Sequence, residues 1–210
     1  MPRKYVRKLP PSDAPQRILS AAAEEMAAKG FAAVRIDEIA RKADCNKQLI
    51  YYYFGNKEGL RNAVLSRMVD EAAPIWQDVA KADPPEALHR IFHPAASTID
   101  WSRLLAWEGV EYGDPGTESD LVLEERRSQA YQVQVDMVRR AQEAGQIPAE
   151  LDPAMLSVMV TLLAMSRSLV PHIIKLTTGL DAGSPEYAER LWDFTNELFT
   201  VLAAQQNGLT

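Results

Sequence analysis

The amino-acid sequence predicts an all-α protein of about nine helices. Apolar residues recur at helical spacing along most of the chain, and no segment shows the sustained alternation of a strand. Ser, Asp or Asn residues precede these segments and Gly follows several of them, as at helix ends. Residues 1–60 carry 11 Lys and Arg against 7 Asp and Glu, a net +4, whereas the remaining residues carry 12 against 22, a net −10. A basic front on an acidic remainder indicates a polyanion-binding module joined to a different domain.

The N-terminal part divides into a flexible basic arm over residues 1–11 and a head over residues 12–60. The arm holds four basic residues and three prolines and no acidic residue. The expected elements of the head are a helix from Ser12 or Asp13 to Gly30, a helix over 36–43, a turn at Asp44-Cys45, a helix over 47–53 capped by Asn46, and a long helix capped by Asn56. Two short helices joined by a tight turn make a helix-turn-helix.

The body, residues 61–210, also reads as helices. Its expected helices open at Asp83, Asp100, Thr117, Asp152 and Ser184. The helix that opens at Asp152 runs to Thr178 and contains Pro171, which predicts a kink. Its apolar stretch from Met155 to Ile174 includes Arg167 and several hydroxyl residues, so we expect a buried helix rather than a membrane span, and no membrane partner.

Composition excludes several classes of protein. With 47% hydrophobic and 25% charged residues, the 210-residue chain has the balance of a globular protein. One cysteine, Cys45, excludes a disulfide scaffold and favours a reducing compartment, and the N-terminus lacks the apolar core of a signal peptide. A cytoplasmic location is expected.

The helix over 47–53 has side chains suited to DNA. Three consecutive tyrosines follow Ile50 and cannot all be buried, and each offers a flat ring and a hydroxyl that can bond a phosphate oxygen. Gln48 can pair with adenine through two hydrogen bonds, and Lys47 can reach guanine or phosphate. Lys57, at the free amides of the next helix, adds charge to a natural phosphate site. The second helix of such a motif enters the major groove.

This stretch resembles the tetracycline-repressor (TetR) family of transcriptional regulators over roughly residues 14–61. The residues that carry the resemblance are Gly30-Phe31, Ile39-Ala40, Ala43, Asn46-Lys47, Ile50-Tyr51, Phe54, Asn56-Lys57-Glu58 and Leu60. Beyond residue 61 the architecture alone agrees. The resemblance implies a homodimer that places two copies of helix 47–53 in the major grooves of a palindromic operator. It also implies a body that dimerises through its last two helices and binds a small-molecule effector that weakens DNA binding.

Three positions depart from the family pattern. Arg35 stands where a Ser or Thr usually caps the second helix, which costs about 0.5–2 kcal/mol but can add a phosphate contact. Asp44 stands where the turn usually has Gly, and Leu49 replaces a small hydroxyl residue. The expected DNA-binding residues are Arg35, Asn46, Lys47, Gln48, Tyr51, Tyr52, Tyr53 and Lys57.

Two further sets of residues are expected in the body. Aromatic and carboxylate side chains at helical spacing suit a ligand pocket or, equally, a core: Trp101, Leu104, Trp107, Glu108, Glu111, Tyr112, Arg167 and His172. The candidate dimer interface, whose alternative is intrachain core, comprises Met159, Leu162, Leu169, Ile173, Leu191, Phe194 and Leu198.

The main hypothesis is a ligand-responsive dimeric regulator, in the first instance a repressor. An enzyme with an accessory DNA module and a non-specific architectural DNA protein are the alternatives. We find no phosphate loop, zinc-protease spacing or nucleophile elbow, and expect no enzymatic activity and no cofactor. His89 and His93 with Glu86 have a spacing that metal sites use, but a polar helix face is preferred, so no metal is expected. Cys45 is either a redox sensor or an inert buried thiol.

Overall fold

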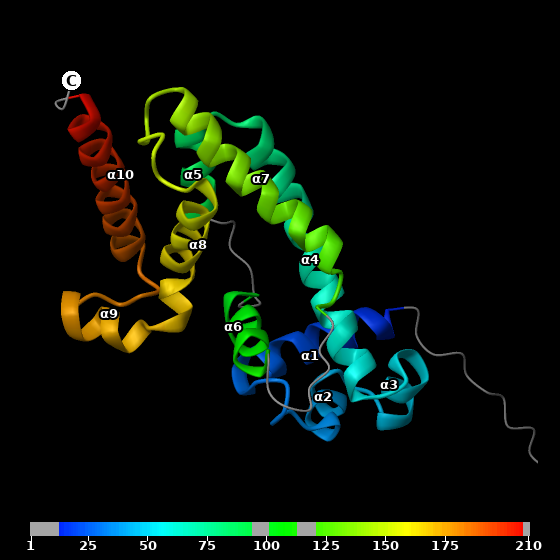
Figure 1. Ribbon diagram of the computed structural model, residues 1–210. Helices are drawn as coiled ribbons and strands as arrows, with labels where there is room; N and C mark the ends of the chain where they lie inside the picture. Colours follow the sequence, from blue (N-terminus) through cyan, green and yellow to red (C-terminus); the bar gives the residue numbers. More distant parts are fainter. Residues whose placement is uncertain (1–12, 94–100, 113–120, 208–210) are drawn as a thin grey trace, which may run out of the picture. The chain divides into compact units, whose positions relative to one another are not determined.

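A computed structural model describes residues 13–93, 101–112 and 121–207, and every regular element in these ranges is an α-helix (Figure 1). The helices are α1 (Ala14–Lys29), α2 (Ile36–Lys42), α3 (Lys47–Phe54), α4 (Lys57–Lys81), α5 (Pro84–Phe92), α6 (Trp101–Glu111), α7 (Glu124–Glu143), α8 (Pro153–Leu169), α9 (Pro171–Thr178) and α10 (Pro185–Asn207). The predicted all-α class is therefore confirmed. The expected arm over 1–11 and the helix openings at Asp100 and Thr117 lie outside the described residues.

Two helix boundaries differ from the expected ones. The helix expected as far as Thr178 ends at Leu169, and α9 then leaves at an angle of 87°. Val170 has φ −131° and ψ 44°, because a residue before proline is disfavoured in the helical conformation. In the described part of the segment expected as a helix from Thr117, α7 begins at Glu124, after Leu123 in the left-handed region at φ 55°. Among the described helices none alone is long and apolar enough to cross a bilayer, and the bent pair α8–α9 meets that requirement by length and composition only.

The helices form two compact units. The first unit contains α1, α2, α3, the first part of α4 up to Arg67, and α6. The second unit contains the rest of α4 with α5, α7, α8, α9 and α10. Within the first unit, α6 packs with α1.

Local capping defines the helix starts of the first unit. The side chain of Asn46 accepts a hydrogen bond from the Leu49 amide at 2.9 Å, and that of Asn56 accepts one from the Gly59 amide at 2.7 Å. These two predicted caps are confirmed. Of the two expected caps of α1, Ser12 lies outside the described residues, and Asp13 occupies the cap position without a side-chain capping bond, with its carboxylate 3.4 Å from Arg17 Nε. Fully buried apolar side chains from four helices fill the core of the unit: Ile18, Ala22 and Met26 of α1, Ile39 of α2, Ile50 of α3, and Leu60, Val64 and Leu65 of α4.

A tryptophan joins α6 to the end of α1. The indole Nε1 of Trp107 donates to the Ala27 carbonyl at 3.3 Å, and Leu104 is completely buried. Gly30 ends α1 at φ 83° and ψ 162°, a conformation that essentially only glycine adopts. A Cβ on Gly30 would meet the Trp107 ring at 3.0 Å. The absence of a side chain at Gly30 therefore lets the indole lie directly on the backbone.

We expect Gly30→Ala to lower the free energy of unfolding of the protein by about 2–4 kcal/mol, because backbone strain and crowding of Trp107 add. Gly55→Ala is the matched control, since Gly55 also has a positive φ of 75° but no atom within 4 Å of its added Cβ. Urea unfolding measures both variants. Equal losses of stability in the two would show that contact with Trp107 contributes nothing.

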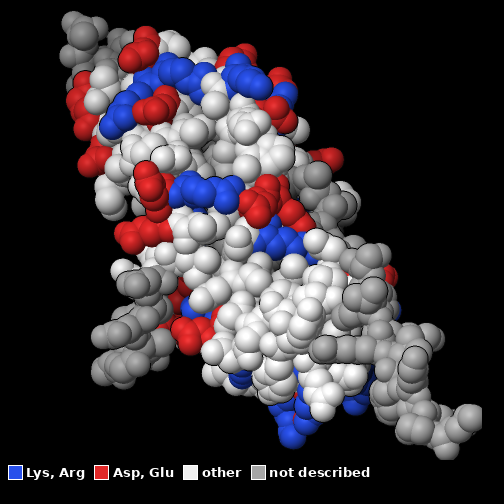
Figure 2. Space-filling model, turned by 90° about the vertical axis from the view of Figure 1, so that its right-hand side faces the viewer, with Lys and Arg blue, Asp and Glu red and all other residues white. Residues whose placement is uncertain are grey.

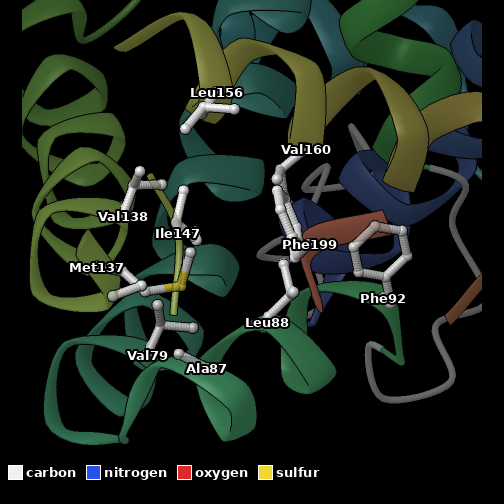
Figure 3. Close-up of a cluster of buried hydrophobic side chains, with 11 residues drawn as sticks. Val79, Ala87, Leu88, Phe92, Met137, Val138, Ile147, Leu156, Val160 and Phe199 are labelled. Carbon is white, nitrogen blue, oxygen red and sulfur yellow. The ribbon is translucent and has the colours of Figure 1, made fainter. Parts of the chain in front are cut away.

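The second unit has its own core, built from α4, α5, α7, α8, α10 and the Ile147 segment (Figure 3). The buried residues are Val79, Ala87, Leu88, Phe92, Met137, Val138, Ala141, Ile147, Leu156, Val160 and Phe199. One polar group is buried between α7 and α8: the Gln134 amide donates to the Ser157 carbonyl at 3.1 Å and accepts from the Thr161 hydroxyl at 3.2 Å. Because both ends of the amide are paired, its burial is compatible with a stable core.

Candidate nucleic-acid interface

The turn between α2 and α3 is closed by main-chain hydrogen bonds. The Cys45 amide donates to the Ala40 carbonyl at 2.9 Å, and the Asp44 amide donates to the Arg41 carbonyl at 3.3 Å. Asp44 has φ 49°, in the left-handed region that Asp tolerates better than most residues. Glycine is thus not required at this turn, and the helix-turn-helix is formed with Asp in its place.

One side of α3 packs inward and the other is exposed. Ile50 is completely buried, Leu49 and Tyr53 are half-buried, and Tyr52 is 67% exposed. The exposed residues Lys47, Gln48, Tyr51 and Tyr52 lie at spacings of three and four and so share one helix face. We call these four residues the reading face. Tyr53 is not part of it: its ring contacts Tyr52 edge-on at 5.1 Å between centroids and lies 6.2 Å from that of Phe54.

Lys29 and Lys42 of the first unit each form ion pairs with two acidic residues. Lys29 pairs with Glu25 at 2.7 Å and Glu38 at 2.8 Å, and Lys42 pairs with Glu24 and Glu25. Hydrogen bonds from the two lysines lower the pKa of Glu25. The stabilisation linked to that shift is present above the ordinary Glu pKa and is lost as pH falls through the lowered value. By contrast, Lys47 pairs with Asp37 in the first turn of α2.

Two other predicted DNA contacts lie near the ends of helices. Arg35 is exposed in extended conformation before α2, and its side chain makes no capping bond. Lys57 is half-buried, and its ammonium donates to the Ala32 carbonyl at 2.7 Å, which ties α4 to the turn before α2. Two N–H groups of the Lys57 ammonium remain for a phosphate. Figure 2 shows Lys and Arg side chains at the lower end of the face in view, where Figure 1 places α2 and α3, and further ones among Asp and Glu in its middle and upper parts.

Sequence reasoning missed Asp37. The signal that could have found it is its position in the first turn of the first helix of a helix-turn-helix, ten residues before Lys47 at the start of the second helix.

Cys45 lies half-buried in the same turn. Burial raises the pKa of its thiol, the charge of Arg17 acts in the opposite direction, and Asp44 raises it further. The thiolate fraction at neutral pH is therefore smaller than for a free cysteine, which favours the inert thiol of the two alternatives.

The expected pocket residues are divided between the two units. Six of them lie on or next to α6 in the first unit: Trp101, Leu104, Trp107, Glu108, Glu111 and Tyr112. Arg167 and His172 belong to the second unit, where Arg167 Nε donates to the Ala182 carbonyl at 2.9 Å and His172 is exposed. Trp107 and Arg167 thus both have a structural partner within their own unit.

The expected dimer residues lie in the second unit and differ in exposure. Leu162, Leu169, Ile173 and Phe194 are exposed, whereas Met159 and Leu191 pack against the core of their own chain and Leu198 is half-buried. Further exposed apolar side chains accompany them: Met155 and Val158 on α8, Leu176 on α9 and Val201 on α10. Met155, Val158, Leu162 and Leu169 lie at spacings of three, four and seven, so they form one stripe along α8, which we call the α8 stripe.

The histidine pair packs against a tryptophan. The rings of His89 and His93 stack at 4.2 Å between centroids, and Trp192 contacts His89 edge-on at 5.1 Å. Glu86, the third member of the candidate metal set, binds Arg90 at 2.8 Å. Among the described residues there is no group of three or more side chains able to hold a metal ion.

Comparison with known proteins agrees with a helix-turn-helix that exposes a polar and aromatic face. Residues 18–64 match the model for bacterial regulatory proteins of the tetR family, and residues 83–189 match the tetracyclin repressor-like C-terminal domain. The HTH-type transcriptional repressor SCO4008 of Streptomyces coelicolor is 36% identical over 173 residues, covering 80% of this chain and 85% of the relative. The HTH-type transcriptional repressor NicS of Pseudomonas putida is 36% identical over 46% of this chain and 48% of its own.

Solved structures share the fold. SCO4942 of Streptomyces coelicolor has a TM-score of 0.68 at 26% identity, covering 88% of this chain and 97% of its own. The regulatory protein TetR of Rhodobacter sphaeroides has a TM-score of 0.68 at 21% identity, covering 91% and 99%. The chain belongs to the TetR family and is a DNA-binding transcriptional regulator of the repressor type.

Proposed function

We propose that the protein is a homodimer that represses transcription by binding a palindromic operator through the reading face of α3 and leaves the operator when a small-molecule effector binds. The observation that carries this proposal is the face itself. Gln48, Tyr51 and Tyr52 are exposed together around the buried anchor Ile50. A solvated helix face gains nothing from two exposed tyrosines, whereas a DNA groove offers phosphates and thymine methyl groups to them.

The dimer is supported by the apolar surface of the second unit. Leu162 is 57% exposed within the α8 stripe, and Phe194 and Val201 are exposed seven residues apart on α10. Exposed apolar side chains that share one face of a long helix, as in the α8 stripe, favour an interaction surface. A two-fold dimer would present two copies of α3, and a palindrome matches that symmetry.

We also propose an effector-binding site in the C-terminal part of the chain. The match of residues 83–189 to the C-terminal family domain supports a ligand-binding role for this part of the chain. The α6 residues and Arg167 with His172 stay the predicted lining. Because Trp107 joins α6 to the end of α1 within the first unit, a ligand that moved α6 would also move α1. We further propose that the protein is not an enzyme and acts in the cytoplasm.

The test is selection of duplexes from a random-sequence library by the purified full-length protein, followed by fluorescence anisotropy at fixed near-physiological salt. We expect one enriched palindrome that is bound tightly in the presence of random competitor duplex. Uniform weak binding that disappears with added salt would contradict the proposal and favour the architectural alternative.

A further inference from the structure

Asp37 places a negative charge beside the reading face. Its carboxylate binds the ammonium of Lys47, the first residue of α3, across the turn of the helix-turn-helix. The side chains of Lys47 and Asp37 are 54% and 48% exposed, so both reach solvent in the free protein. An ion pair this exposed is weak, and a DNA phosphate is therefore able to compete with Asp37 for Lys47.

The neighbouring acid has a different partner. Glu38 binds Lys29, at 2.8 Å, and Lys29 also binds Glu25 on α1. The two consecutive acidic residues of α2 therefore bind different lysines. Asp37 binds Lys47 of the reading face, and Glu38 binds Lys29 at the end of α1. The pair Asp37–Lys47 is thus separable by mutation from the general charge of α2.

The geometry points to Asp37 as a specificity-determining residue, which competes with DNA phosphates for Lys47 and so limits binding to non-operator DNA. This inference rests on the proposed function of α3. On random duplexes nearly all binding free energy comes from cations that neutralise phosphates. A lysine already neutralised by Asp37 releases fewer counterions when it meets a phosphate, so it adds little to non-specific affinity.

On the operator, Lys47 has a second use. With α3 in the major groove, an ammonium held by one carboxylate keeps two N–H groups for guanine acceptors. Loss of Asp37 would let Lys47 turn from the bases to a phosphate, exchanging one favourable contact for another. Removal of Asp37 is therefore expected to raise the affinity mainly for random DNA.

The experiment compares the parent, Asp37→Asn and the matched control Glu38→Gln, each as the full-length protein, by anisotropy over a range of salt. The probes are a random-sequence duplex and the duplex that the parent enriches from a library. We expect Asp37→Asn to bind the random duplex about ten- to sixtyfold more tightly at 0.1 M salt than Glu38→Gln does, with a salt slope larger by about 1.8, as for one added phosphate contact in each subunit of the dimer. Its preference for the enriched duplex should fall by a similar factor.

A Lys47→Met background tests whether Lys47 carries the effect. There, Asp37→Asn should behave like Glu38→Gln. The inference is overturned if Asp37→Asn equals the control on random DNA, if its affinity for both duplexes rises equally, or if the effect persists without Lys47. If instead the parent enriches no duplex, the proposed function fails. A Lys47-dependent gain on random DNA would in that case uphold the competition alone and overturn the specificity role.

Discussion

Leu162→Glu is expected to convert the protein to a monomer and to lower its affinity for the enriched duplex at least about 100-fold. Leu162 is 57% exposed in the middle of the α8 stripe, between Val158 and Leu169. In a two-fold interface the change enters twice, and each glutamate would be an unpaired charge among apolar side chains, which costs several kcal/mol. A dimer binds DNA through two linked copies of α3 and so gains avidity that a monomer lacks. Loss of the dimer therefore lowers the affinity for DNA strongly.

Light scattering after size exclusion measures the mass of the particle, and anisotropy measures the affinity. The matched control is Val110→Glu, since Val110 is 68% exposed on α6 in the first unit, outside the α8 stripe. The control should keep the parent's mass and affinity. A Leu162→Glu protein that remains dimeric with unchanged affinity would place the dimer interface elsewhere.

Gln48→Ala is expected to lower affinity for the enriched duplex about 30-fold or more and to leave random-duplex affinity unchanged. A bidentate contact to adenine contributes about 1–3 kcal/mol, and a palindrome contains it twice. Gln48 carries no charge, so it adds nothing to the counterion release that governs non-specific binding. The side chain of Gln48 is exposed, so its truncation is expected to leave the folding stability almost unchanged.

The same anisotropy assay on both duplexes checks this prediction, with Gln132→Ala, an exposed glutamine on α7, as control. If Gln48→Ala binds the two duplexes as the parent does, the assignment of base reading to Gln48 is wrong. In that event Tyr51 and Tyr52, the other members of the reading face, become the residues to replace next.

Most of the helix caps, which depend on contacts within one helical turn, were predicted from the sequence, although Asp13 makes no capping bond. Asn46 and Asn56 cap their helices through bonds that span three residues, and Asp83 and Asp152 do the same in the second unit. Such bonds require only the local chain, so the pattern of cap, Pro and Gly is sufficient to locate them. The exposure of Gln48, Tyr51 and Tyr52 followed from the same local logic, because Leu49 or Ile50 had to face inward. That Ile50 is the buried residue, and that Tyr53 is half-buried, was decided by packing.

Contacts between residues far apart in the chain were decided only by the tertiary structure. Trp107 joins the Ala27 carbonyl from 80 residues away and places α6 with α1, although its spacing suited a ligand pocket equally well. Lys47 was predicted as a DNA contact, and its ion pair with Asp37 became visible only where the turn brings the two side chains together. Helical periodicity determines which face of a helix is apolar but not which partner covers it, since many helices offer the same face. The sequence by itself therefore determined the all-α class, the caps at Asn46, Asn56, Asp83 and Asp152, and the exposure of Gln48, Tyr51 and Tyr52, whereas packing decided the partners of α6 and of Lys47.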